Sequence, residues 1–143
     1  MDKLVSIVVP IFNLLNNYIE ENNLNEDITL LGYQENPYSY VHKADLFVCS
    51  SYNEGFSTAV TESLVVGTPV VTTLCSGMEE LLGTNNEFGL ITKNTEDALY
   101  EGMVKLINSP KLLEYYRNKA VERGQEFSLE NTIKATENLF DSL

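Results

Sequence analysis

Hydrophobic residues along this chain alternate between short continuous runs and stripes with helical spacing. Five short runs are rich in β-branched, leucine or aromatic residues and end at Pro, Gly or polar residues, which is typical of buried strands. The sequence therefore predicts strands at Val5–Val9, Ile28–Leu31, Leu46–Ser50, Pro69–Thr73 and Phe88–Thr92.

Between and after these runs, apolar residues recur at intervals of three and four, as they do on one face of a helix. The predicted helices cover residues 14–23, 37–43, 58–66, 77–82, 95–108, 110–125 and 128–140. Pro37 and Pro110 suit the first helical turn, and Ser128 suits an N-cap. We interpret the last three helices as packing elements, because their apolar stripes carry no chemistry.

This order of elements predicts the fold class. Strands alternate with helices through the first two-thirds of the chain, and the strands are apolar on both faces. The pattern favours an α/β, Rossmann-like parallel sheet of about five strands flanked by helices. A length of 143 residues fits one domain, so we assign residues 1–143 to a single domain.

Composition excludes several functions. The formal net charge of −12 makes nucleic acid and anionic membranes poor partners. No apolar run reaches the length of a membrane span, and 4–12 lacks the features of a signal peptide, so we expect a cytoplasmic protein. Cys49 and Cys75 form no disulfide framework or metal motif, and Cys49 is interpreted as a buried thiol. His42, the single histidine, is interpreted as a helix-surface or core residue rather than a catalytic one.

Three loops are predicted at the carboxyl ends of strands, where parallel sheets bind ligands: Gly32–Gln34, Glu54–Ser57 and Cys75–Gly77. The middle loop enters a helix that contains Glu62. An ionised carboxylate can accept hydrogen bonds from two hydroxyls, and backbone N–H groups at a helix start suit a phosphate. The spacing predicts a sugar-nucleotide pocket. The alternative is a pair of solvated carboxylates at a helix entrance, and an ordinary turn and cap explain Gly77 and Glu80 equally well.

One longer pattern carries a family resemblance. The segment Ala44–Ser57 reads ADLFVCSSYNEGFS, and it is followed by Glu62-Ser63-Leu64 and by Gly67-Thr68-Pro69-Val70-Val71. From about Leu14 to the C-terminus, the chain resembles the donor-binding half of retaining GT-B glycosyltransferases, the group 1 glycosyl transferases. The resemblance implies a GT-B C-terminal-domain fold.

The resemblance also implies roles for individual residues. Glu54 would accept hydrogen bonds from the donor sugar near the reacting centre, which makes it the candidate catalytic residue. Glu62 would hold the ribose hydroxyls. The remaining donor-binding candidates would contribute backbone N–H groups, the helix start or contacts to the base: Gly55, Phe56, Ser57, Thr58, Gly32, Tyr33 and Gln34.

The implied reaction transfers a hexose from a nucleoside diphosphate sugar with retention, in polysaccharide or glycoconjugate biosynthesis, without a metal or other cofactor. The chain lacks the acceptor-binding half of such enzymes and the Arg and Lys that neutralise the leaving diphosphate, so we expect little transfer by this chain alone. A partner subunit would then supply the acceptor site. The alternative is a non-catalytic truncated homologue that acts as an assembly partner or is an inactive remnant. A dehydrogenase is disfavoured, because no Gly-x-Gly-x-x-Gly follows the first strand.

Residues 1–13 are an atypical first strand. They resemble the opening of GT-A family 2 glycosyltransferases, either through a join of two genes or by chance, since buried strands are repetitive. In the GT-B fold the strand that this chain lacks lies near the centre of the sheet. Its loss predicts an unpaired edge, and such an edge favours a homodimer or strand exchange.

Overall fold

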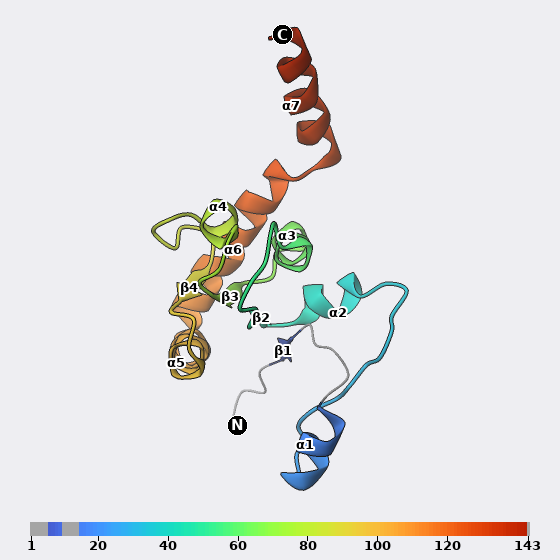
Figure 1. Cartoon of the computed structure of the whole chain (residues 1–143), viewed down its shortest axis with the longest axis vertical. Coiled ribbons are helices and arrows are strands. Elements are labelled where there is room, and N and C mark those ends of the chain that lie inside the picture. Colours follow the sequence, from blue (N-terminus) through green and yellow to red (C-terminus); the bar gives the residue numbers. More distant parts are fainter. Residues whose placement is uncertain (1–5, 10–14, 143) are drawn as a thin grey trace.

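The computed structural model describes residues 6–9 and 15–142 of the chain. Within them, four parallel strands form one sheet in the order β1-β2-β3-β4 (Figure 1). The strands are β1 (Ile7–Val8), β2 (Leu46–Cys49), β3 (Val70–Thr73) and β4 (Leu90–Thr92). The predicted parallel α/β sheet is therefore confirmed, although the described residues contribute four strands to it rather than five.

The helices match the predicted ranges to within about two residues. They are α1 (Asn16–Glu21), α2 (Tyr38–Lys43), α3 (Thr58–Val65), α4 (Met78–Leu82), α5 (Glu96–Ile107), α6 (Pro110–Glu126) and α7 (Leu129–Asp141). The helices α3, α5 and α7 begin after Ser57, Thr95 and Ser128, and each of these hydroxyls accepts a hydrogen bond from the amide three residues later. These caps explain why the helices begin where the sequence predicts.

Helices cover both faces of the sheet, and neighbouring strand residues alternate between the two resulting cores. Phe47, Cys49 and Val70 pack with residues of α3 and α4 on one face. Leu46, Val48 and Val71 pack with residues of α5 on the other face. The helix α6 contributes to both cores, through Ala120 on the first face and Leu113 and Tyr116 on the second. All residues of β2 and β3 are buried, as expected for strands that are apolar on both faces.

Two predictions for the N-terminal third were wrong. Residues Ile28–Leu31 form no strand and are exposed, although their composition is strand-like. Strand formation needs a neighbouring strand for its backbone groups, and none of the four strands of the sheet pairs with these residues. The run Val5–Val9 was predicted to be fully buried, but Ile7 and Val9 are 37% and 39% exposed, and Val5 lies outside the described residues.

The helix α7 is also not the packing element that we expected. Figure 1 shows α7 projecting from one end of the molecule and α1 from the other. All of its described residues are exposed, including its large apolar side chains Leu129, Ile133, Leu139 and Phe140. None of the helices in the described part of the chain is both long and apolar enough to span a bilayer.

Candidate functional site

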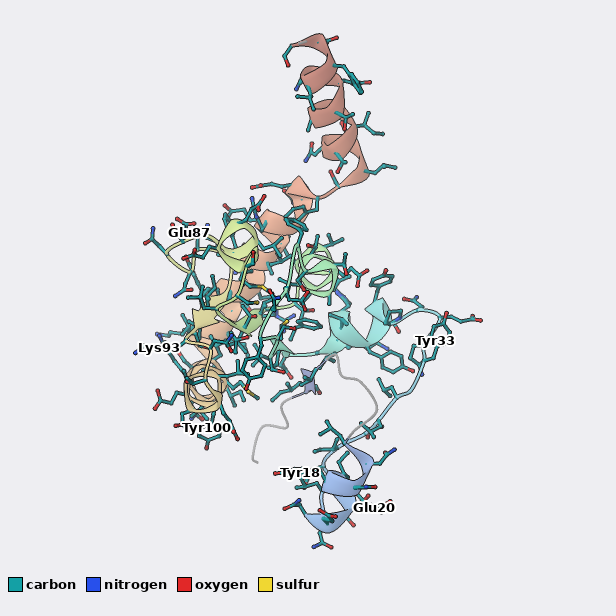
Figure 2. The ribbon with its side chains drawn as sticks, viewed as in Figure 1. Tyr18, Glu20, Tyr33, Glu87, Lys93 and Tyr100 are labelled. Atoms are coloured by element: carbon teal, nitrogen blue, oxygen red, sulfur yellow. The ribbon has the colours of Figure 1, made fainter. Side chains whose placement is uncertain are left out.

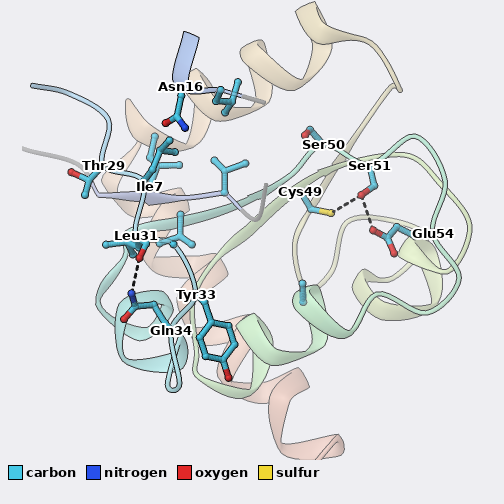
Figure 3. Close-up of a pocket in the computed structure, with 16 residues that line it drawn as sticks. Ile7, Asn16, Thr29, Leu31, Tyr33, Gln34, Cys49, Ser50, Ser51 and Glu54 are labelled. Carbon is cyan, nitrogen blue, oxygen red and sulfur yellow. Dashed lines mark hydrogen bonds between the residues drawn. The ribbon is translucent and has the colours of Figure 1, made fainter. Parts of the chain in front are cut away.

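A cavity of about 1050 Å³ opens beside β1 and the end of β2. Its walls come from β1, the start of α1, the extended segment 29–34, the turn after β2 and one turn of α3. Figure 3 shows Ser51 and Glu54 at one end of the cavity and Asn16 and Thr29 toward the other. Of the candidate residues, Glu54, Gly32, Tyr33 and Gln34 line this cavity, whereas Gly55, Phe56, Ser57, Thr58 and Glu62 are not part of its wall.

Glu54 is held in the cavity wall by the turn that follows β2. The hydroxyl of Ser51 donates a hydrogen bond of 2.6 Å to Oε1 of Glu54, and the Cys49 thiol lies 3.7 Å from the same hydroxyl (Figure 3). Thr73 at the end of β3 donates to the carbonyl of Ser51 at 2.6 Å. The turn is thus tied to two strands, and a carboxylate has enough lone pairs to accept further hydrogen bonds from a ligand.

Gly32–Gln34 forms the opposite wall. Gly32 has a φ of +63°, and the side chain of Gln34 donates a 2.7 Å hydrogen bond to the carbonyl of Leu31, which closes the turn. Tyr33 is 91% exposed and lies at the outer edge of the molecule (Figure 2). This loop follows no strand, contrary to our prediction, yet the fold still brings it to the same cavity as Glu54.

The turn between Glu54 and α3 is shaped by a second loop. Gly77 has a φ of +80°, and a Cβ at this position would overlap the carbonyl oxygen of Gly55. Phe56 meets Phe127 edge-on, with ring centroids 6.1 Å apart. Ser57 is only 3% exposed and caps α3 through Val60 N, so its side chain serves the helix. The Gly77 loop was predicted at this edge of the sheet, and it contacts the Gly55 turn directly.

Glu62 is exposed on α3, and its partner is on α2. The Tyr38 hydroxyl donates a 3.2 Å hydrogen bond to Oε1 of Glu62. This hydrogen bond, and then the charge of Glu62, raise the pKa of Tyr38 above its ordinary value. Ala59, three residues before Glu62 and therefore close to it on the surface of α3, lines the cavity, whereas Glu62 does not.

Cys49, Cys75 and His42 are the remaining residues that the sequence analysis considered. Cys49 is buried, as predicted, and Cys75 is partly buried. Burial, then the neighbouring Cys49 and Glu54, raise the pKa of the Cys75 thiol. Nδ1 of His42 lies 2.8 Å from the carbonyl oxygen of Val66 on the exposed side of α2, which confirms a helix-surface residue.

The described side chains that line the cavity carry negative charge only. Glu54 is the only charged residue among the described residues that line it, and none of them is Lys or Arg. The two arginines lie elsewhere: Arg117 donates to the carbonyl of Ala44, and Arg123 to the carbonyls of Glu80 and Leu81. In the described part of the chain, no group of three or more His, Cys, Asp or Glu side chains is placed to hold a metal ion. Metal independence stays a prediction.

Sequence reasoning missed two residues that position the glutamates. Ser51 precedes Glu54 by three residues, a separation short enough that their hydrogen bond could have been predicted from the sequence. Tyr38 lies 24 residues before Glu62, so nothing local in the sequence indicated their contact.

Comparison with known proteins identifies the family. The model described as "Glycosyl transferases group 1" matches residues 11–123. An N-acetylgalactosamine-N,N'-diacetylbacillosaminyl-diphospho-undecaprenol 4-alpha-N-acetylgalactosaminyltransferase of Campylobacter jejuni is 40% identical over 111 residues, which cover 76% of this chain and 30% of that protein. A poly(glycerol-phosphate) alpha-glucosyltransferase of Bacillus subtilis is 27% identical, over 86% of this chain and 18% of that protein.

Solved structures share the fold. Sucrose-phosphate synthase from Thermosynechococcus elongatus superposes with a TM-score of 0.76 at 21% identity, over 96% of this chain and 39% of that chain. HepE from Anabaena, solved in complex with UDP, superposes with a TM-score of 0.76 at 20% identity, over 98% of this chain and 41% of that chain. In all four comparisons the chain spans less than half of the other protein. With a family match over most of its length, this chain belongs to the group 1 glycosyl transferases.

Proposed function

We propose that this chain binds a nucleoside diphosphate sugar at the cavity beside Glu54 and takes part in hexose transfer with retention, in polysaccharide or glycoconjugate biosynthesis. The observation that carries the proposal is the position of Glu54, which lines the cavity at the carboxyl end of a parallel strand, opposite the Gly32–Gln34 loop. Family membership supports the reaction class, and the names of the two relatives describe glycosyl transfer to a diphospho-undecaprenol-linked saccharide and to poly(glycerol-phosphate).

Each part of the donor has a matching chemical group. The donor sugar would place its hydroxyls against the Glu54 carboxylate, whose Oε1 is already oriented by Ser51. The diphosphate would lie near the Gly55 turn and the first turn of α3, where backbone N–H groups and the helix dipole favour an anion. The ribose would reach Glu62, and the base would lie along Gly32–Gln34. Phe56 and Thr58, on either side of the buried Ser57, are exposed residues.

Transfer itself would need a second component. Departure of a nucleoside diphosphate builds negative charge, and the described lining residues include no cation to stabilise that charge. A partner polypeptide that supplies cations and an acceptor site would complete the centre. The isolated chain is then expected to bind nucleotide with little turnover.

Isothermal titration tests the proposal, beginning with UDP and GDP and their hexose derivatives. UDP comes first because a structural relative was solved with it. Saturable heat that is lost in Glu62→Ala and in Glu54→Gln would support the proposal. Glu101→Gln, which alters an exposed glutamate of α5 away from the cavity, is the matched control and should bind as the parent does.

The alternative function is that of a non-catalytic homologue. It is favoured by the absence of Lys and Arg among the described residues that line the cavity. It predicts no heat with any nucleotide while the thermal unfolding of the chain stays cooperative. Binding that survives both glutamate substitutions would also contradict the proposed site.

A further inference from the structure

The two edges of the sheet differ in how they are protected. At the β4 edge, the backbone N–H of Ile91 donates a 2.8 Å hydrogen bond to Oδ1 of Asn86, so a side chain occupies the position of a further strand. The Tyr116 hydroxyl holds the Asn86 carbonyl in turn, at 3.2 Å. Such a cover prevents pairing with another chain.

The β1 edge has no such cover within the described residues. The Ser6 carbonyl accepts hydrogen bonds from the backbone N–H groups of Asp45 and Leu46, so Ser6 directs its backbone toward β2. In a strand, successive residues direct their backbone groups to opposite sides. Val8 therefore also faces β2, whereas Ile7 and Val9 present their N–H and C=O groups to the outer edge. The exposed fractions of 37% and 39% for these two side chains agree with an uncovered edge.

The cavity described above lies beside this edge, and its far wall contains residues of strand-like composition that form no strand. Leu30 and Leu31 line it opposite β1, and both are more than two-fifths exposed although they are large and apolar. A strand inserted here would pair with the outer edge of β1 and cover leucines that are now in contact with water. Burial of apolar surface and new backbone hydrogen bonds would both favour its insertion.

The negative charge of the chain favours a positively charged strand as the binding partner of this edge. The chain carries 21 acidic and 9 basic residues, and Glu54 is the one charged residue among the described residues of the cavity wall. A second copy would itself carry a net charge of −12, and repulsion between two such chains opposes association. An extended segment with basic residues is complementary to the edge and to the cavity.

We propose that the outer edge of β1 binds an extended, basic β-strand from a different polypeptide, which lies between β1 and residues 29–31 and leaves the part of the cavity lined by Gly32–Gln34 and Glu54 to the donor. Strand binding at this edge needs no nucleotide. The chain could therefore bind nucleotide and no strand, or a strand and no nucleotide, and the two results are distinguishable. The strand would also bring its cations to the end of the cavity that contains Glu54.

The test uses the full chain and a fluorescein-labelled peptide of sequence Lys-Val-Thr-Val-Thr-Val-Lys, with binding measured by fluorescence anisotropy. The edge variant is Ile7→Pro. It removes an N–H that faces outward, so the bonds between β1 and β2 remain and thermal unfolding should be unchanged. Its matched control is Ile7→Val, which keeps the N–H and a β-branched side chain.

The parent chain and Ile7→Val should bind the peptide, and Ile7→Pro should weaken binding by about tenfold or more. A peptide with Pro in place of the central Val should not bind, and a peptide with Glu in place of both Lys residues should bind more weakly. Hydrogen exchange should slow at the Ile7 and Val9 amides when the peptide is bound.

Absence of peptide binding by the parent chain would overturn the proposal, as would equal binding by Ile7→Pro. If the chain alone forms a dimer in sedimentation equilibrium that Ile7→Pro dissociates, the occupant is a second copy and the assignment to a different polypeptide is wrong.

Discussion

The Tyr38 hydroxyl donates a hydrogen bond to Oε1 of Glu62 across 3.2 Å, and this contact joins α2 to the helix that follows the Glu54 turn. The two residues are 24 positions apart in the chain. If Glu62 holds a ribose, Tyr38 acts as a positioning residue that restricts the carboxylate to one orientation.

Replacing Tyr38 by Phe should weaken nucleotide binding by about two- to fivefold, the range for one exposed hydrogen bond that orients a ligand group. Titration calorimetry with the nucleotide that the parent chain binds gives the measurement. Tyr40→Phe is the matched control, because Tyr40 lies on the same helix and its hydroxyl has no hydrogen bond within the described residues. Equal affinities for both variants and the parent would show that Tyr38 does not position Glu62.

The same hydrogen bond gives a pH dependence. Glu62 raises the pKa of Tyr38 above 10.0 in the folded chain, so neutral tyrosine is the favoured form. The resulting stabilisation is fully present below pH 10.0 and is lost as the pH rises through the folded pKa. In a ¹³C-tyrosine NMR titration, Glu62→Gln should lower the Tyr38 pKa, whereas Glu101→Gln should leave it unchanged. An unchanged Tyr38 pKa in Glu62→Gln would refute the contact.

Gly77→Ala should lower the free energy of unfolding by about 2 kcal/mol or more. Left-handed backbone alone costs about 1–2 kcal/mol for a residue with a Cβ, and this Cβ would also overlap the Gly55 carbonyl. Gly55→Ala is the matched comparison, because a Cβ there meets nothing within 4 Å. Urea unfolding should place Gly55→Ala within about 1 kcal/mol of the parent. Similar losses in both variants would mean that the two loops do not pack as described.

Arg123 should be the most costly cation to remove among those on α6. It donates to the carbonyls of Leu81 at 3.0 Å and Glu80 at 2.6 Å, and its guanidinium lies 5.1 Å from the Phe88 ring centroid and 5.2 Å from that of Phe127. Arg123→Ala is expected to cost about 2 kcal/mol, since it leaves carbonyls at the end of α4 without a partner.

Arg123→Lys should recover less than half of that loss, because an ammonium cannot bridge both carbonyls and stack on both rings. The control is Lys134→Ala on α7, whose exposed pair with Glu130 should contribute less than about 1 kcal/mol. If urea unfolding shows that Arg123→Lys regains all of the stability lost in Arg123→Ala, the positive charge alone explains the contribution of Arg123.

Cys75 should react slowly with iodoacetamide near neutral pH. Burial is the main cause of its raised pKa, and Cys49 and Glu54 add to it, so the thiolate is scarce below the ordinary value of 9.0. Mass spectrometry of alkylated peptides over a pH series should give a midpoint above 9.0, and Glu54→Gln should move that midpoint downward. A midpoint below 9.0 in the parent chain would be incompatible with these surroundings.

Much of the fold was predictable because its signals are local. The apolar run of β2, the β-branched run of β3, the capping residues Ser57 and Ser128, and Gly67 after α3 each act within a few positions of the chain. The Glu54 turn could be placed at the carboxyl end of a strand for the same reason. The error at Ile28–Leu31 arose because strand-like residues form a strand only when the fold brings them into pairing contact with another strand, and residues 29–31 lie across the cavity from β1 instead.

The sequence by itself determined the α/β class, the order of strands and helices apart from Ile28–Leu31, and the family, since each depends on residue type at short spacing. The tertiary structure alone decided which distant residues meet: Tyr38 with Glu62, Gly77 with Gly55, and segment 29–34 with β1. It also decided which faces stay exposed, namely the outer edge of β1 and the apolar side of α7. These contacts depend on how complete elements pack against one another, and no short stretch of sequence contains that information.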